Sequence, residues 1–226
     1  MPPQQPLLER PLLHVVALLT FLDVMGVAAL LLLCYFLYKA YRVSSNRLFA
    51  FFFLGFAVLA AGEVARTFLL LFALASRASR LLLFFLAHSI GPLPQLCQAL
   101  ALLLIASGYA LETVRSRAGE EVLALPLPLA LLLAQRLWGG LYMLLSFVNV
   151  ALLVFILLNA VSVHLLSRSR RTILPVAAFA LLLLSNLLLL PAVSIGSEEL
   201  FIASKVVYLA GLLAFLALAV EVARAR

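Results

Sequence analysis

The stretch from Leu48 to Ala75, LFAFFFLGFAVLAAGEVARTFLLLFALA, decides the fold class of this chain. It is 28 residues long and apolar except at a few positions, most of them within Gly62-Glu63-Val64-Ala65-Arg66. About 20 apolar residues suffice for a helix to cross the hydrocarbon core of a bilayer, so the run predicts a membrane-spanning helix. A charged side chain inside such a helix costs about 2.5–3.5 kcal/mol on insertion scales unless it pairs or reaches water. Glu63 and Arg66 lie three residues apart on one helical face, where they are able to neutralise each other.

The composition of the whole chain points the same way. Hydrophobic residues make up 66% of the 226 residues and charged residues only 11%, whereas about a quarter of an ordinary soluble domain is charged. The apolar runs are continuous rather than alternating, which favours helices over a barrel. The net charge is +7, but the basic residues are scattered through short loops, as expected for a cytoplasmic rim and not for a nucleic-acid surface. We therefore expect an all-α polytopic membrane protein in a lipid bilayer, in the plasma membrane of a prokaryote, that binds no nucleic acid.

Seven hydrophobic segments are visible, at about 12–38, 48–75, 81–112, 120–135, 137–165, 172–193 and 200–222. Basic residues concentrate after the first, third, fifth and seventh segments: Lys39, Arg42, Arg47, Arg115, Arg117, Arg168, Arg170, Arg171, Arg224 and Arg226. The opposite side collects fewer: Arg10, Arg77, Arg80 and Arg136. Because positive residues gather in the cytoplasm, we expect seven transmembrane helices with the amino terminus outside and the carboxyl terminus inside.

A short pattern indicates an internal repeat. The third segment ends in Glu-x-x-Arg-x-Arg at 112–117, and the seventh ends in the same spacing at 221–226. This predicts two parallel pseudo-repeats of three helices, 12–117 and 137–226, joined by a linker helix at 120–136. The whole chain is then a single membrane domain with a three-plus-one-plus-three layout.

The repeat also changes the interpretation of the long third segment. Its counterpart begins near Leu200, which aligns with Gly91-Pro92-Leu93-Pro94. We expect the third helix to start there, because proline is tolerated in the first turn, where its missing N–H is not needed. Residues 81–90 then form an outer interfacial element. The alternative is one long helix kinked at the prolines.

Four ionisable residues within the apolar segments are the candidate binding residues: Asp23, Glu63, Arg66 and Lys205. Glu63 lies roughly 24 Å along its helix from Arg47, a depth similar to that of Lys205, so a contact between Glu63 and Lys205 is geometrically possible. Asp23 is deeper, and Gly26 one turn away is expected to allow close approach of a neighbouring helix. The structural alternatives are a self-contained Glu63–Arg66 pair, a Lys205 that reaches the outer surface, and a buried Asp23 held by a hydroxyl group or kept neutral.

Other residues do not indicate a cofactor or a catalytic centre. His14, His88 and His164 are far apart in the sequence and do not have the spacing of haem or metal ligands. Nucleophile-elbow, Walker, CxxC and HExxH patterns do not occur. We therefore expect no cofactor, no metal and no enzyme activity.

Two family resemblances follow from the layout. The three-plus-one-plus-three arrangement is similar to that of the SWEET and PQ-loop carriers of sugars and amino acids, and Pro94-Gln95 is a PQ dipeptide. In that family the motif belongs to the first helix of each repeat, whereas here it falls in the third helix, once. A seven-helix bundle with a lysine in the last helix also resembles the microbial rhodopsins, which would make Lys205 a retinal-binding residue. The third helix here lacks their counter-ion carboxylate.

Three functions remain open. The first is a carrier or channel for a small solute or ion, with an outward-facing polar cavity between the two helix triplets lined by the four ionisable residues. The second is a non-catalytic subunit or anchor of a larger membrane complex with partner subunits. The third is a seven-helix sensor or receptor.

Overall fold

The computed structural model describes residues 9–75, 92–116, 141–167 and 172–224, and almost all of these residues are helical. The helices are α1 (Glu9–Ser44), α2 (Arg47–Ala75), α4 (Pro92–Ser116), α6 (Leu141–Ser167), α7 (Ile173–Ile195) and α8 (Glu198–Arg224). Within the described residues, six helices are long and apolar enough to cross a membrane. The chain is therefore all-helical where it is described, and it fits a multi-pass integral membrane protein.

Six of the seven expected segments correspond to these helices, with ends that differ by a few residues. At α1, the helix Glu9–Ser44 extends beyond the apolar run 12–38 at both ends. A helix continues past its apolar run because its backbone hydrogen bonds form equally well at the polar border. The fourth segment, 120–136, and the interfacial element, 81–90, lie outside the described residues. The count of seven and the orientation in the membrane therefore stay predictions.

The described part of the third expected helix begins at Pro92, the first residue of α4. The residues before it lie outside the described residues, so the choice between a break there and one long kinked helix stays a prediction. Proline at the first helical position has the backbone angle that a helix needs and lacks only an N–H that would have no helical partner.

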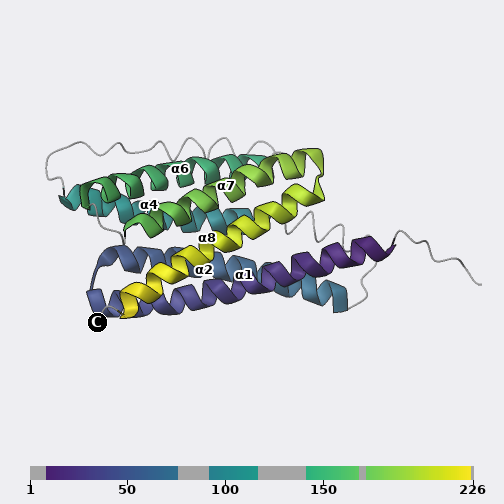
Figure 1. Ribbon diagram of the computed structural model, residues 1–226, viewed down its shortest axis with the longest axis horizontal. Helices are drawn as coiled ribbons and strands as arrows, with labels where there is room; N and C mark the ends of the chain where they lie inside the picture. Colours follow the sequence, from purple (N-terminus) through teal and green to yellow (C-terminus); the bar gives the residue numbers. More distant parts are fainter. Residues whose placement is uncertain (1–8, 76–91, 117–140, 168–171, 225–226) are drawn as a thin grey trace, which may run out of the picture.

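The six described helices form a ring in which each packs on two neighbours, in the order α1, α2, α4, α6, α7, α8 and back to α1. Helices α2 and α7 run antiparallel to the other four (Figure 1). Both triplets, α1-α2-α4 and α6-α7-α8, thus have the same neighbour order and the same alternation of direction. The ring has two seams between triplets, α1 against α8 and α4 against α6, and parallel helices meet at both. This arrangement accommodates the expected duplication, which itself stays a prediction.

Local sequence explains the two tight turns. Asn46 precedes α2, and its side-chain oxygen accepts a hydrogen bond of 2.8 Å from the Leu48 backbone N–H, which satisfies one free donor at the helix start. Helix α7 ends at Gly196, which has a φ of 70°, a conformation that glycine adopts without strain. Both turns therefore connect antiparallel helices within a triplet.

Glycines bring α2 and α4 into close contact. A Cβ at Gly55 would lie 2.8 Å from the backbone oxygen of Ala101, and a Cβ at Gly62 would lie 2.6 Å from the Cβ of Cys97. Gly108 on α4 fits against Phe51 on α2 in the same way, at 2.7 Å. In a bilayer, where lipid tails are as apolar as the side chains, such small residues allow the dispersion contacts that hold helices together. The α2–α4 pair is thus fixed along most of its length.

An aromatic cluster fills the interior toward the end of the bundle where α1 ends. Phe56, Phe179 and Phe215 are buried, and the Phe179 and Phe215 ring centroids are 4.7 Å apart. Phe52 and Tyr109 extend the cluster to α4, with ring centroids 5.6 Å apart. Phe56 lies seven residues from Glu63, which is about 10 Å along α2. The cluster therefore fills the bundle interior between the charged residues and the end of the bundle where α1 ends.

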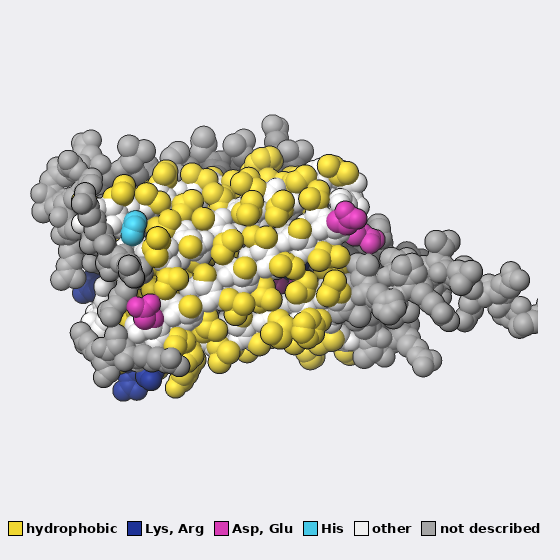
Figure 2. Space-filling view, viewed as in Figure 1, with side chains coloured by type: hydrophobic (Ala, Val, Ile, Leu, Met, Phe, Trp, Pro, Cys, Tyr) yellow, Lys and Arg dark blue, Asp and Glu magenta, His cyan; other side chains and the backbone are white. Residues whose placement is uncertain are grey.

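The outer surface is apolar. Figure 2 shows hydrophobic side chains over the middle of the visible face, with charged side chains near its two ends. Large exposed hydrophobic residues occur on all six described helices, among them Phe21, Phe68, Leu96, Leu158, Ile195 and Leu213. An apolar surface of this extent is stable only in a lipid environment or against other apolar helices.

We expect Gly62→Val to lower the melting temperature of the protein in mild detergent. The new side chain would overlap with Cys97, which is 2.6 Å from the added Cβ, and overpacking of this kind costs about 1–3 kcal/mol. Gly26→Val is the matched control, because no described atom lies within 4 Å of a Cβ at that position. An equal loss of stability in both variants would contradict the close packing of α2 on α4.

Candidate functional site

Asp23 on α1 is the centre of a buried charge cluster. The Lys205 ammonium group on α8 donates a hydrogen bond of 2.8 Å to Asp23 Oδ1. The Arg66 guanidinium group on α2 donates to Asp23 Oδ2. The Asp23 side chain is only 6% exposed, so both ion pairs are shielded from water and much stronger than surface pairs. One carboxylate thus joins three helices, and α8 belongs to a different triplet from α1 and α2.

Glu63 completes the cluster. Its Oε2 lies 3.6 Å from Arg66 Nη1, as expected for residues three apart on one helical face. The four groups carry two negative and two positive charges, so the cluster is neutral overall. The Glu63–Lys205 contact that helix geometry allows is not the ion pair that forms among the described side chains, because Lys205 pairs with Asp23. The partners of Asp23 are thus two cations, Arg66 and Lys205.

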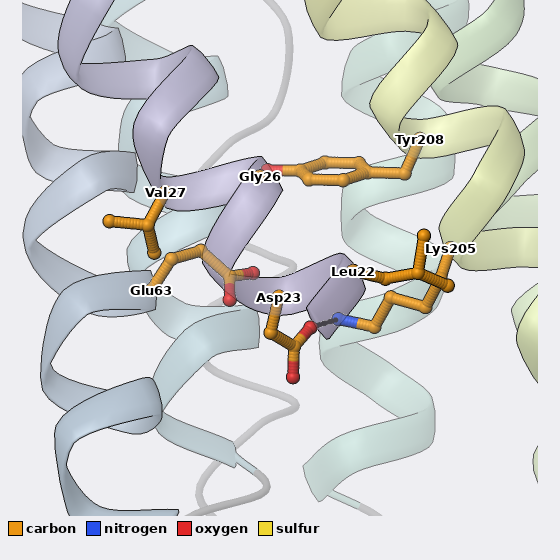
Figure 3. Close-up of a pocket in the computed structure, with 7 residues that line it drawn as sticks. All are labelled: Leu22, Asp23, Gly26, Val27, Glu63, Lys205 and Tyr208. Carbon is orange, nitrogen blue, oxygen red and sulfur yellow. Dashed lines mark hydrogen bonds and ion pairs between the residues drawn. The ribbon is translucent and has the colours of Figure 1, made fainter. Parts of the chain in front are cut away.

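A small pocket lies beside this cluster. It is lined by Leu22, Asp23, Gly26, Val27, Glu63, Lys205 and Tyr208. Figure 3 shows the Tyr208 ring extending from α8 toward Gly26 on α1, with Glu63 on the far side of that helix turn. The Tyr208 hydroxyl group is buried and has no hydrogen-bond partner among the described residues. A buried hydroxyl group without a partner is costly, so the pocket is suited to a polar guest that would bind it.

Gly26 has a different role from the one expected. It does not bring a neighbouring helix close, because no described atom lies within 4 Å of the position that its Cβ would take. Its missing side chain instead leaves the open space of the pocket. That space holds about one water molecule, so the site as it stands is closed to a larger guest.

The charge cluster continues into a layer of uncharged polar side chains. Asn149 on α6 donates hydrogen bonds to the side-chain oxygen of Gln95 at 2.7 Å and to its backbone oxygen at 3.3 Å. Gln98 on α4 donates to the side-chain oxygen of Asn186 on α7 at 3.3 Å. The first contact bridges the second seam, between α4 and α6, and the second joins α4 to α7. Each seam between the triplets therefore holds a polar cluster, charged at one seam and neutral at the other.

Two serines connect α7 with α8. Ser185 on α7 and Ser204 on α8 each donate a hydrogen bond of 3.0 Å to the other residue's backbone oxygen. Ser204 directly precedes Lys205, which returns the chain of contacts to Asp23 on α1. Gly62 against Cys97 links the charged residues of α2 to the level of Gln95 on α4. Every described helix thus contributes a polar residue to one layer of the bundle, which we call the polar layer.

In the described part of the chain, no group of three or more histidine, cysteine, aspartate and glutamate side chains is placed to hold a metal ion. The charged groups are carboxylates, an ammonium group and a guanidinium group.

All four predicted binding residues meet in this one site, while sequence reasoning missed Tyr208. Its signal was available, because Tyr208 lies three residues after Lys205 and shares its helical face. Asn149, Asn186 and Ser185 form hydrogen bonds between helices. Asn159 differs, since it donates to the backbone oxygen of Phe155 on its own helix.

We expect Asp23→Asn to destabilise the protein by about 3–5 kcal/mol, because it leaves two buried cations without their shared carboxylate. Denaturant unfolding in mixed micelles measures the change. The double variant Asp23→Asn/Lys205→Met should lose less than the sum of the two single variants, since it removes both partners of one pair. Exposed Glu199→Gln is the control and should change stability by about 0.5 kcal/mol or less. Additive losses would show that Asp23 and Lys205 are not coupled.

No protein-family model matches this chain, and comparisons with curated proteins and with solved structures also find no match. The function must therefore be argued from the site itself.

Proposed function

We propose that this chain is a membrane carrier or channel for a small solute or ion, with Asp23, Glu63, Arg66 and Lys205 lining its polar site. The observation that carries the proposal is that these four residues, which come from three helices, form one charge cluster beside a small pocket at the seam between α1 and α8. In carriers built from repeats, the binding site lies at the interface between the repeats.

The burial of the site supports a transport role over a surface role. Ionisable groups within membrane helices are costly, and they mark ion or substrate pathways by default. Lys205 lies seven residues from the start of α8, which is about 10 Å from that end of the bundle. On its other side the aromatic cluster around Phe56, Phe179 and Phe215 blocks the interior. The site thus lies near one end of the bundle and is closed toward the other, as in one state of an alternating-access cycle.

The size of the pocket limits which solutes are able to bind. Space for about one water molecule admits an ion or a very small polar molecule, whereas a sugar or an amino acid would require the triplets to separate. An ion is therefore favoured over a larger solute.

The neutrality of the cluster favours one alternative, a subunit or anchor in a larger membrane complex. Both Asp23 oxygens are occupied by cations of the chain itself, as in a purely structural ion-pair lock. The apolar outer surface would then serve partner helices as well as lipid. A flux measurement separates the two functions, because a lock conducts nothing.

We expect the purified protein in liposomes to support flux of a small ion that protein-free liposomes lack. Sodium, potassium and proton gradients are the probes, with glycerol as an uncharged comparison. Gly26→Val should fill the pocket and reduce that flux at least about tenfold while leaving the fold intact, because its Cβ meets no described neighbour. Asp23→Asn should abolish the flux.

The control for these variants is Lys39→Met, which removes a charge from an exposed position on α1 far from the site. Folding of each variant is checked by its elution profile and melting temperature. Absence of flux for every probe, or flux that is unchanged in Gly26→Val and Asp23→Asn, would contradict the carrier and favour the structural lock.

A further inference from the structure

We propose that the site binds a monovalent cation in exchange for the ammonium group of Lys205. The inference rests on the carrier proposed above and names the class of its cargo. Lys205 acts as a tethered competitor that occupies the carboxylates while the site is empty.

The charge of the cluster is the first argument. Two carboxylates and two fixed cations sum to zero, and a free cation added to this cluster would leave a net positive charge in a medium of low dielectric constant. If the Lys205 ammonium group leaves as the cation enters, the charge at the site is unchanged and the large desolvation cost is avoided. The ammonium group, 2.8 Å from Asp23 Oδ1, thus marks a place whose chemistry already suits a small cation.

The two fixed cations differ in their ability to move. Arg66 is held by two carboxylates, since it contacts both Asp23 and Glu63. Lys205 contacts only Asp23 among the described carboxylates, and its ammonium group is a point charge on a flexible stem. Lys205 is therefore the group that is free to be displaced.

The pocket supplies the ligands that an incoming cation needs. Among the described residues, the nearest cationic atom to Glu63 is 3.6 Å away, so this carboxylate has oxygen lone pairs to spare. The Tyr208 hydroxyl oxygen is buried, has no described partner, and borders the same space. Gly26 leaves that space open. A carboxylate and a hydroxyl oxygen are hard ligands, which suits an alkali-metal or ammonium ion.

Lys205 also has a route out of the site along α8. The Phe201 ring, one turn closer to the helix start, lies 6.0 Å from the Lys205 nitrogen, within reach of a cation–π contact. Glu198 is a further turn on, exposed and seven residues from Lys205, on the same helical face. A long lysine side chain is able to turn its charge toward such a helix end while its stem stays packed. Glu198 and Glu199 also attract cations to this end of the bundle.

An anion fits the site less well. Both cationic groups already have carboxylate partners, and an anion would have to displace a covalently fixed carboxylate to reach them. The acidic end of α8 would also repel it.

The test measures cation binding by thermal unfolding of the full chain in lipid nanodiscs. Sodium, potassium and ammonium chloride are compared with the chloride of N-methylglucamine, a cation too large for the pocket, at constant total chloride. We expect the three small cations to stabilise the wild-type protein and N-methylglucamine not to do so. Lys205→Met removes the competitor, so it should melt at a lower temperature in N-methylglucamine, recover in the small cations, and bind them at least about tenfold more tightly.

Lys39→Met is the matched control, because it removes the only other lysine, which is exposed and distant from the site; its cation response should equal that of the wild type. Glu63→Gln should weaken binding at least about tenfold by removing a charged ligand. Equal or weaker cation binding by Lys205→Met than by the wild type would overturn the exchange.

Gly26→Val keeps the test decisive if Lys205→Met does not fold. It fills the pocket and leaves the ion pairs intact, so it should remove the stabilisation by small cations; stabilisation equal to that of the wild type would overturn the site. Binding without flux in liposomes would preserve this inference and contradict the carrier. Flux without cation-specific stabilisation would contradict this inference and preserve the carrier.

Discussion

The structure depends on the sharing of one carboxylate by two cations in a medium of low dielectric constant. Asp23 alone, Arg66 alone or Lys205 alone would be costly inside a bilayer. Together with Glu63 they form a neutral group, and their mutual attraction is strong because water is excluded. The requirement that these side chains meet fixes the rotation of α1, α2 and α8 about their axes, since a helix turned by a quarter would place its charge in lipid. The charge cluster therefore specifies how the first and second triplets face each other.

The uncharged part of the polar layer serves the other seam in a weaker way. The hydrogen bonds of Asn149 to Gln95 and of Gln98 to Asn186 hold α4, α6 and α7 at the same level as the ion pairs. Hydrogen bonds of this kind contribute about 0.6 kcal/mol each in membrane proteins, less than a buried ion pair loses when it is broken. The polar contacts at the two seams thus lie at a similar level of the bundle, but those at the seam between α1 and α8 are stronger. A duplicated ancestor with polar residues in equivalent positions would explain the matched depth, and divergence would explain the difference in charge.

The sequence sufficed for the helices and for the identity of the four charged residues, because both follow from the cost of placing groups in hydrocarbon. A run such as 48–75 permits few structures other than a spanning helix, and a charge within it must find a partner. Which partner it finds is not a local property. Depth along the helix suggested Glu63 for Lys205, but the choice of Asp23 depends on the rotation and the neighbours of α1 and α8. The prediction for Gly26 was wrong for the same reason. A glycine occurs both where two helices touch and where a pocket opens, and the sequence alone does not distinguish the two.

The distribution of contacts indicates where the bundle would open if the triplets move. The close approaches made by Gly55, Gly62 and Gly108 all lie between α2 and α4, and that of Gly211 lies between α7 and α8. All of these are pairs within one triplet, and such dry, close-packed contacts resist sliding because any displacement creates overlap. The seams carry polar contacts in addition to their apolar packing, and these polar contacts are able to re-form with water or an ion as the helices separate. Close packing within the triplets and exchangeable polar contacts between them are the mechanical properties that two rigid halves need to rock about a shared site.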